Sequence, residues 1–196
     1  MNKPFITYTA QIEKLKTEKN LIITDTDFAV ESLQNISYYA LIGGYKHPFI
    51  DIYTRKYIND ACFEDIVALY EFDEELRGIF FKYLCRVKRK MRSSISYHFC
   101  KKHGERQEEY LNSNNYSNIS KNKNGSKYIY GKNDLFSVVI AFRYLLPKAD
   151  FLLFKKQLLH IFGHYEKQNS NLKLNDLFKY MGFPNNWKWI TKFRKI

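Results

Sequence analysis

Residues 63–104 read FEDIVALYEFDEELRGIFFKYLCRVKRKMRSSISYHFCKKHG, and apolar side chains recur in this run every three to four positions. That spacing is the period of one face of an α-helix. The repeating positions are Leu69, Phe72, Leu76, Phe80, Tyr83, Val87, Met91 and Ile95. The pattern predicts one long helix with these residues on its core face, and it leaves open a bend near residues 71–73.

The same run carries a cluster of cations. At 100° per residue, they fall mostly on the side of the helix opposite the apolar face. The cluster consists of Lys82, Arg86, Lys88, Arg89 and Arg92. A cationic helix face suits a polyanion, with nucleic acid as the first candidate. A solvated helix exterior explains the cluster equally well when the cluster is considered alone.

The whole chain is basic, with a formal net charge of +12 over 196 residues. Such a charge favours RNA, DNA or an anionic membrane surface as the partner. No apolar run approaches the roughly 20 residues that span a bilayer, and the first residues, MNKPFITYTAQIEKLK, have no apolar core resembling a signal peptide. The three cysteines are too scattered for a disulfide framework. We therefore expect a cytoplasmic protein without a membrane partner.

The chain divides at residues 112–133, NSNNYSNISKNKNGSKYIYGKN, which show no period and predict a long, partly mobile loop. We expect a helical region at 1–111 and further helices of the same domain at 134–196. The predicted helices are 8–19, 27–37, the long run, 135–146, 150–165 and 174–181. Gly43 and Gly44 should break any helix, and 50–57 could form a short ribbon. The predicted fold class is all-α, a helical bundle.

The chemistry-bearing residues are few. The sequence has no phosphate-binding glycine loop, no serine elbow and no paired-cysteine metal site, so it predicts no cofactor and no metal. His160 and His164 have a spacing that can chelate a metal, but surface histidines are the simpler interpretation. Tyr38, Tyr39 and Tyr45 flank the glycine pair, where a loop could expose their rings for stacking on unpaired bases.

Arg92 and His98 are the candidate catalytic residues. An arginine can hold a phosphate and a histidine can move a proton, which suffices for metal-independent RNA cleavage by the ribose 2′-hydroxyl. On a straight helix, however, a six-residue step turns about 240° and rises about 9 Å. The two side chains then diverge by about 120°, and His98 falls near the apolar face, where a core histidine is the alternative. A helix bend or a second protomer could bring such groups together.

The chain contains four segments in a specific order: KPFITYTAQIEKL, NISYYALIGGYKHPF, FEDIVALYEFDEELRGIFFKYLCRVKRKMRSSISYH and MGFPNNW. Together they resemble the Abi family of bacterial abortive-infection proteins, which is similar to the all-helical HEPN ribonucleases. In those enzymes an arginine and a histidine form the active site, generally across a dimer. The resemblance implies a HEPN-like bundle, a homodimer, antiphage defence in a toxin–antitoxin setting, and an RNA partner, with a small noncoding RNA as one candidate.

One departure from the family bears on activity. Family members are typically longer and carry an Arg-Asn-x-Cys-Ala-His segment, whereas here residues 112–133 occupy most of that interval. Arg92 and His98 are the remaining pair with five residues between an arginine and a histidine. The sequence therefore favours a catalytically weak or silent RNA-binding protein. The alternative is a metal-independent endoribonuclease that uses Arg92 and His98.

Overall fold

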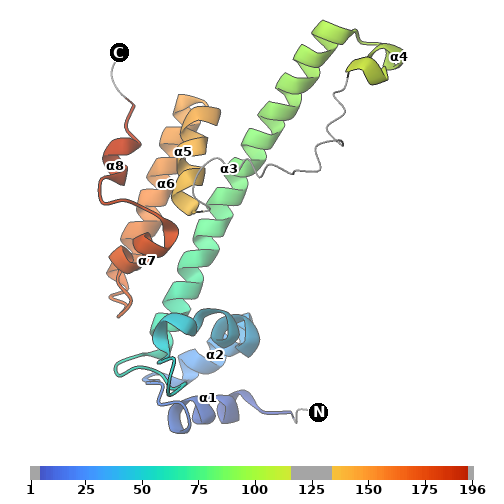
Figure 1. The fold of residues 1–196 in the computed structure, drawn as a ribbon. Coiled ribbons are helices and arrows are strands. Elements are labelled where there is room, and N and C mark those ends of the chain that lie inside the picture. Colours follow the sequence, from blue (N-terminus) through green and yellow to red (C-terminus); the bar gives the residue numbers. More distant parts are fainter. Residues whose placement is uncertain (1–4, 116–133, 194–196) are drawn as a thin grey trace. The chain divides into compact units, whose positions relative to one another are not determined.

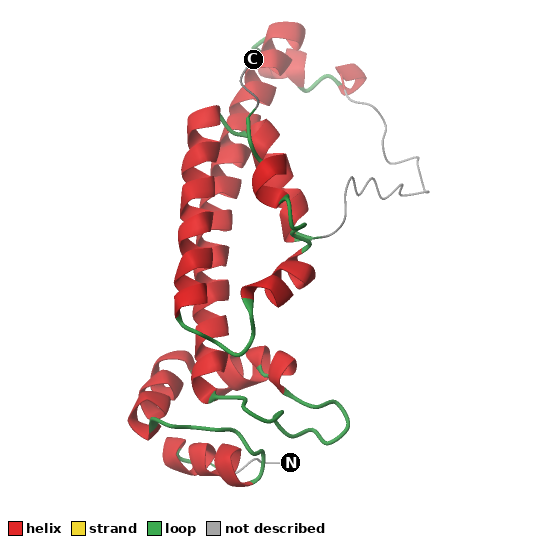
Figure 2. Ribbon diagram, turned by 90° about the vertical axis from the view of Figure 1, so that its left-hand side faces the viewer, coloured by secondary structure: helices red, strands yellow, loops and turns green. Residues whose placement is uncertain are grey.

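The computed structural model describes residues 5–115 and 134–193, so most of the predicted loop, residues 116–133, lies outside the described part of the chain. The regular structure of the described residues is helical, which confirms the all-α prediction (Figure 2). The predicted ribbon at 50–57 is reduced to one antiparallel bridge between Ile50 and Tyr57. Within 5–115 and 134–193, no helix is both long enough and apolar enough to cross a membrane.

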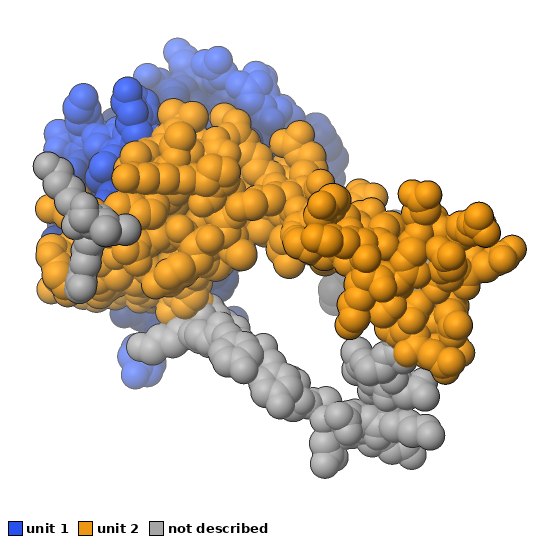
Figure 3. All heavy atoms as spheres, turned by 90° about the horizontal axis from the view of Figure 1, so that it is seen from above, with its two compact units in different colours: residues 1–79, 155–178 blue, residues 80–154, 179–196 orange. Residues whose placement is uncertain are grey.

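The chain divides into two compact units, which Figure 3 colours separately. The first unit comprises residues 1–79 and 155–178, and the second comprises residues 80–154 and 179–196. Helices α3 (Phe63–His103), α6 (Lys148–Lys167) and α7 (Leu174–Met181) contribute residues to both units. The domain boundaries that the sequence predicted at residues 111 and 134 are not tested by this division and remain a prediction.

The first unit begins with the two helices that Figure 1 labels α1 and α2. Each of them starts at a side-chain cap. In α1 (Tyr8–Thr17) the Thr7 hydroxyl accepts a hydrogen bond from the Ala10 amide, and in α2 (Thr26–Ile36) the Asp25 carboxylate accepts one from the Phe28 amide. Such caps satisfy amide groups that have no partner inside the helix. After α1 the chain reverses at Asn20, which has a φ of 60°. Both helices match the predicted ranges 8–19 and 27–37 to within two residues at each end.

A buried carboxylate ties the start of α3 to the segment after α6. Asp65 is 6% exposed, and its oxygens accept hydrogen bonds from the Asn171 backbone amide and side-chain amide, each at 2.9 Å. The Cys62 amide donates to the same carboxylate at 3.3 Å. Around this point the core is aromatic, with the Phe72 ring 4.7 Å from that of Tyr165.

The structure corrects the prediction for the glycine pair. Residues Tyr39–Gly43 form a π-helical turn, and Gly44 continues in the right-handed helical region with a φ of −81°. A Cβ added at either glycine would meet no atom within 4 Å. Neither position therefore requires a glycine for a positive φ or for close approach. A short 3-10 turn, His47–Phe49, follows.

The second unit has an aromatic core between α3, α5 (Leu135–Leu145) and α6. Phe142 of α5 and Phe154 of α6 contact Phe80 and Tyr83 of α3, with ring centroids 5.1–6.4 Å apart. Asp134 caps α5 by accepting from the Ser137 amide. The remaining short elements of this unit are α4 (Gln107–Tyr110), a 3-10 turn at Ser113–Asn115, and α8 (Trp187–Ile190).

Helix α3 is one uninterrupted α-helix of 41 residues, including residues 71–73. Its predicted core face is buried through Val87, but the prediction fails beyond that point. Met91 is 48% exposed and Ile95 is 62% exposed. All residues from Lys88 to His98 are exposed, and in Figure 1 this part of α3 extends past α5. The helical period continues there, but no described neighbour covers the apolar face.

Candidate nucleic-acid interface

Lys88, Arg89 and Arg92 lie in the second unit, on the side of α3 that faces away from its core. Tyr83 and Val87 are buried and mark the core side. Successive residues turn by 100°, so Lys88, Arg89 and Arg92 project on the opposite side. All three are exposed. The predicted separation of an apolar and a cationic face is therefore present in this part of α3.

Arg86 differs from the other predicted phosphate ligands because its charge is neutralised. It is half-buried and forms an ion pair with Asp150, in the first turn of α6. Its guanidinium also lies 5.1 Å from the centroid of the Tyr83 ring. Sequence reasoning missed Asp150, because it stands 64 positions away and no local pattern links the two residues.

The remaining cations have fewer contacts. The Lys82 ammonium lies 5.7 Å from the centroid of the Tyr83 ring. Among the described residues, no carboxylate forms an ion pair with Lys88, Arg89 or Arg92. A cation without a carboxylate partner on an exposed helix face can bind phosphate oxygens without first breaking an ion pair. Lys90, which was not predicted as a ligand, donates to the Leu145 carbonyl at 3.2 Å.

Arg92 and His98 are both exposed on the same continuous helix, about 9 Å apart along its axis. The alternative of a core histidine is wrong, because His98 is exposed. The His98 ring lies 5.3 Å from the ring of Tyr97 in an edge-on arrangement. Since α3 is uninterrupted between these positions, no bend there brings the two side chains together within one chain.

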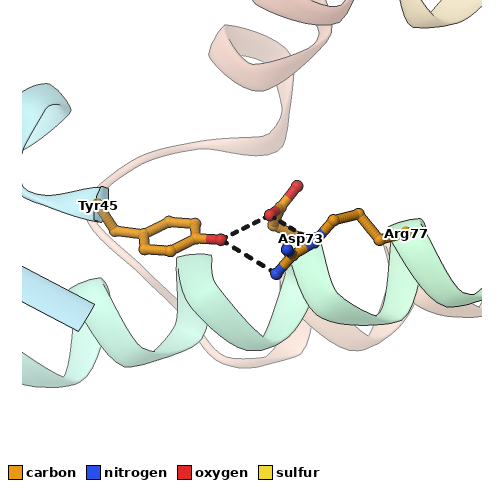
Figure 4. Close-up of polar contacts among 3 residues, drawn as sticks. All are labelled: Tyr45, Asp73 and Arg77. Carbon is orange, nitrogen blue, oxygen red and sulfur yellow. Dashed lines mark hydrogen bonds and ion pairs between the residues drawn. The ribbon is translucent and has the colours of Figure 1, made fainter. Parts of the chain in front are cut away.

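The three tyrosines predicted to stack on bases belong to the first unit and differ in their environments. Tyr39 is 73% exposed, whereas Tyr38 and Tyr45 are half-buried. The Tyr45 hydroxyl donates to the Asp73 carboxylate at 2.6 Å and accepts from Arg77 at 3.3 Å (Figure 4). Burial, followed by this bond to Asp73, raises the pKa of Tyr45 to about 12. Tyr45 thus joins the segment after the π-helical turn to α3.

The histidine pair on α6 has an ordinary surface environment. His160 and His164 are exposed, and His164 lies 3.6 Å from the Glu75 carboxylate. No group of three or more histidine, cysteine, aspartate or glutamate side chains suited to a metal ion occurs in the described residues. The three cysteines, all within the described ranges, are free thiols.

Comparison with known protein families shows the family of the chain. A model of the Abi-like protein family matches residues 31–195, which include the second half of α2, all of α3 and the helices that follow. This chain belongs to the Abi-like protein family. Membership associates the chain with abortive infection, a form of bacterial defence, and it confirms the resemblance noted in the sequence. No curated protein and no solved structure matches the chain.

Proposed function

We propose that this Abi-like protein binds RNA in the bacterial cytoplasm through the exposed cations of α3 and is catalytically weak or silent. The observation that supports this proposal most strongly is the set of exposed cations without an ion-pair partner in the described structure, Lys88, Arg89 and Arg92. A cognate or small noncoding RNA is the expected partner. Binding through phosphates needs neither a cofactor nor a metal.

The geometry favours contacts to the backbone of the RNA over reading of its bases. Lys88 and Arg92 stand about 6 Å apart along the helix axis, with Arg89 between them. These positions form a short row of charges on a helix rather than a pocket that selects a base. Contacts of this kind position a nucleic acid and supply affinity without sequence information. Arg86 contributes less to binding, because Asp150 already neutralises it.

Base stacking on the tyrosines of the first unit would be a separate contact with RNA. Tyr39 is the strongest candidate, since most of its ring is exposed. Stacking of one base on an aromatic side chain contributes about 1–3 kcal/mol. Tyr38 and Tyr45 present less of their rings, so we assign them smaller contributions.

A matched pair of charge reversals tests the proposal. Lys88→Glu should weaken binding of a labelled single-stranded RNA several-fold at low salt. Lys156→Glu changes the net charge equally, at an exposed position on α6, and should change the affinity much less. Equal effects of the two variants would indicate that only net charge matters, and the assignment to α3 would be wrong.

A homodimer is the expected assembly. Met91 and Ile95 are large apolar side chains exposed on the far part of α3, where a second copy could cover them. Burial of such side chains favours association by about 25 cal/mol per Å² of apolar surface removed from water. Met91→Glu with Ile95→Glu should therefore shift the molar mass measured by light scattering from dimer towards monomer.

The alternative function is metal-independent cleavage of RNA by Arg92 and His98. The exposure of His98 favours it, since a proton-transfer group must reach its substrate. The separation of the two side chains along α3 requires that a second protomer complete the site. Under this alternative, cleavage should proceed in EDTA, leave a 2′,3′-cyclic phosphate, and be lost in His98→Ala at unchanged melting temperature. Intact RNA after incubation with the wild type supports the silent protein.

A further inference from the structure

A cavity of about 500 Å³ is lined by residues of the first unit, whereas the residues assigned above to phosphate binding on α3 belong to the second unit. It is lined by the end of α1, the π-helical turn and the segment from Ile50 to Tyr57. This volume falls within the range of about 300–1,000 Å³ that is typical of small-molecule sites. One part of the wall is apolar, formed by Leu15, Ile42 and Ile50.

Backbone hydrogen bonds hold the lining segment in place. The Tyr57 amide donates to the Lys19 carbonyl at 2.9 Å, which joins this segment to the chain just after α1. The Asp51 amide donates to the Lys56 carbonyl at 2.9 Å, beside the bridge between Ile50 and Tyr57. Backbone hydrogen bonds therefore hold the walls of the cavity in place, in addition to the packing of side chains.

Tyr57 is one of the residues that line the cavity, and its hydroxyl is buried. The residue is 6% exposed, and its hydroxyl oxygen has no hydrogen-bond partner among the described residues. A buried polar group without a partner is costly, so such a group marks a place where a ligand could bind. Burial raises the pKa of Tyr57, and the nearby Tyr38 phenol raises it further. Tyr57 is therefore a neutral donor at physiological pH.

The charged groups of the lining are mostly cationic. Lys19, Lys46 and Arg55 form no ion pair with any described carboxylate. The one carboxylate of the lining, Asp51, accepts hydrogen bonds from the backbone amides of Tyr53 and Thr54 at 2.9 and 2.8 Å. These bonds stabilise the turn that Asp51 begins. A wall with this balance of charge favours an anionic ligand.

We propose that this cavity binds one nucleotide unit, with its phosphate on Lys19, Lys46 and Arg55 and its base against the apolar wall and Tyr38. The Tyr57 hydroxyl donates a hydrogen bond to the ligand. Inorganic phosphate alone would leave the apolar wall exposed to water, and a nucleoside would leave the cations without a partner. The unit is either a free mononucleotide or an unpaired nucleotide of a bound RNA, since both present the same chemistry.

Calorimetry on the full chain tests the proposal with 5′-mononucleotides, a nucleoside, inorganic phosphate and a short single-stranded RNA. At least one mononucleotide should bind one site per chain, at least ten-fold more tightly than the nucleoside or inorganic phosphate. Tyr57→Phe removes only the hydroxyl and should weaken that binding by about ten-fold, in line with one hydrogen bond to a charged group. Without ligand, its melting temperature should stay equal to or above that of the wild type, since an unpaired buried hydroxyl is lost.

Further variants separate this site from α3 and distinguish the two sources of the nucleotide. Lys19→Met should weaken mononucleotide binding, whereas Lys156→Met and the pair Lys88→Ala with Arg89→Ala should leave it unchanged. A lower RNA affinity in Tyr57→Phe identifies the nucleotide as part of the RNA, and an unchanged RNA affinity with lost mononucleotide binding identifies it as free. The proposal is wrong if no mononucleotide binds saturably and Tyr57→Phe leaves RNA affinity unchanged.

Discussion

Arg86 and Arg89 stand three positions apart on α3 and have different electrostatic environments. Asp150 and the Tyr83 ring surround the Arg86 guanidinium, whereas Arg89 is exposed and has no carboxylate partner in the described structure. An arginine therefore stabilises the fold at position 86, whereas the arginine at position 89 is available to a ligand. Sequence reasoning treated the two as equivalent, because only the fold brings Asp150 to Arg86.

The two arginines should respond differently to truncation. Arg86→Ala should lower the free energy of unfolding by about 1 kcal/mol, since it removes a half-buried ion pair and a cation–π contact. Arg89→Ala should change that free energy by less than about 0.5 kcal/mol and should weaken RNA binding more. Urea denaturation and RNA titration of both variants give the comparison. A loss of stability in Arg89→Ala equal to that in Arg86→Ala would contradict the assignment.

The Tyr45 phenol should make stability depend on pH in the alkaline range. Its pKa is raised from 10.0 to about 12 in the folded protein, so the folded state retains the proton more strongly than the unfolded state. The stability that this proton provides is fully present below pH 10.0 and is lost as the pH rises through about 12. Between these values the wild type should lose more stability than Tyr45→Phe, measured by denaturation at several pH values. Parallel pH profiles would show that folding does not raise the pKa of Tyr45.

At the scale of elements, the sequence predicted α1, α2 and α5 closely, because the helical spacing of apolar residues is a local pattern. Thr7, Asp25 and Asp134 each cap the helix that follows. The errors occurred where tertiary context decides the outcome. Met91 and Ile95 keep the helical period but extend beyond the described neighbours of α3, so periodicity could not tell a covered face from an exposed one.

The glycine pair shows a second kind of limit. Two adjacent glycines are typical of a break, yet Gly44 has ordinary helical torsions and open space around its Cβ position. Gly44→Ala should therefore stabilise the protein by about 0.4–1 kcal/mol, because alanine loses less backbone entropy on folding. Thermal or urea denaturation of the variant measures this gain. A loss of stability would instead show that this position requires a glycine.

At the scale of the whole molecule, the net charge of +12 predicted an anionic partner but not its place of binding. The structure distinguishes cations engaged in the fold, such as Arg86 and Lys90, from cations without a carboxylate partner, such as Lys88 and Arg89. It also reveals cations around the cavity of the first unit, Lys19 and Arg55 among them, which no sequence pattern grouped. These residues come from separate segments of the chain, and folding alone brings them together.

The salt dependence of RNA affinity tests the central claim most directly. Each phosphate contact on a single strand adds about 0.7 to the slope of log affinity against log salt concentration. Lys88→Ala combined with Arg89→Ala should therefore flatten the slope by about 1.4, and the control Lys156→Ala combined with Lys167→Ala should leave it unchanged. A wild-type slope in the α3 variant, or equal flattening in the control, would contradict RNA binding by the exposed cations of α3.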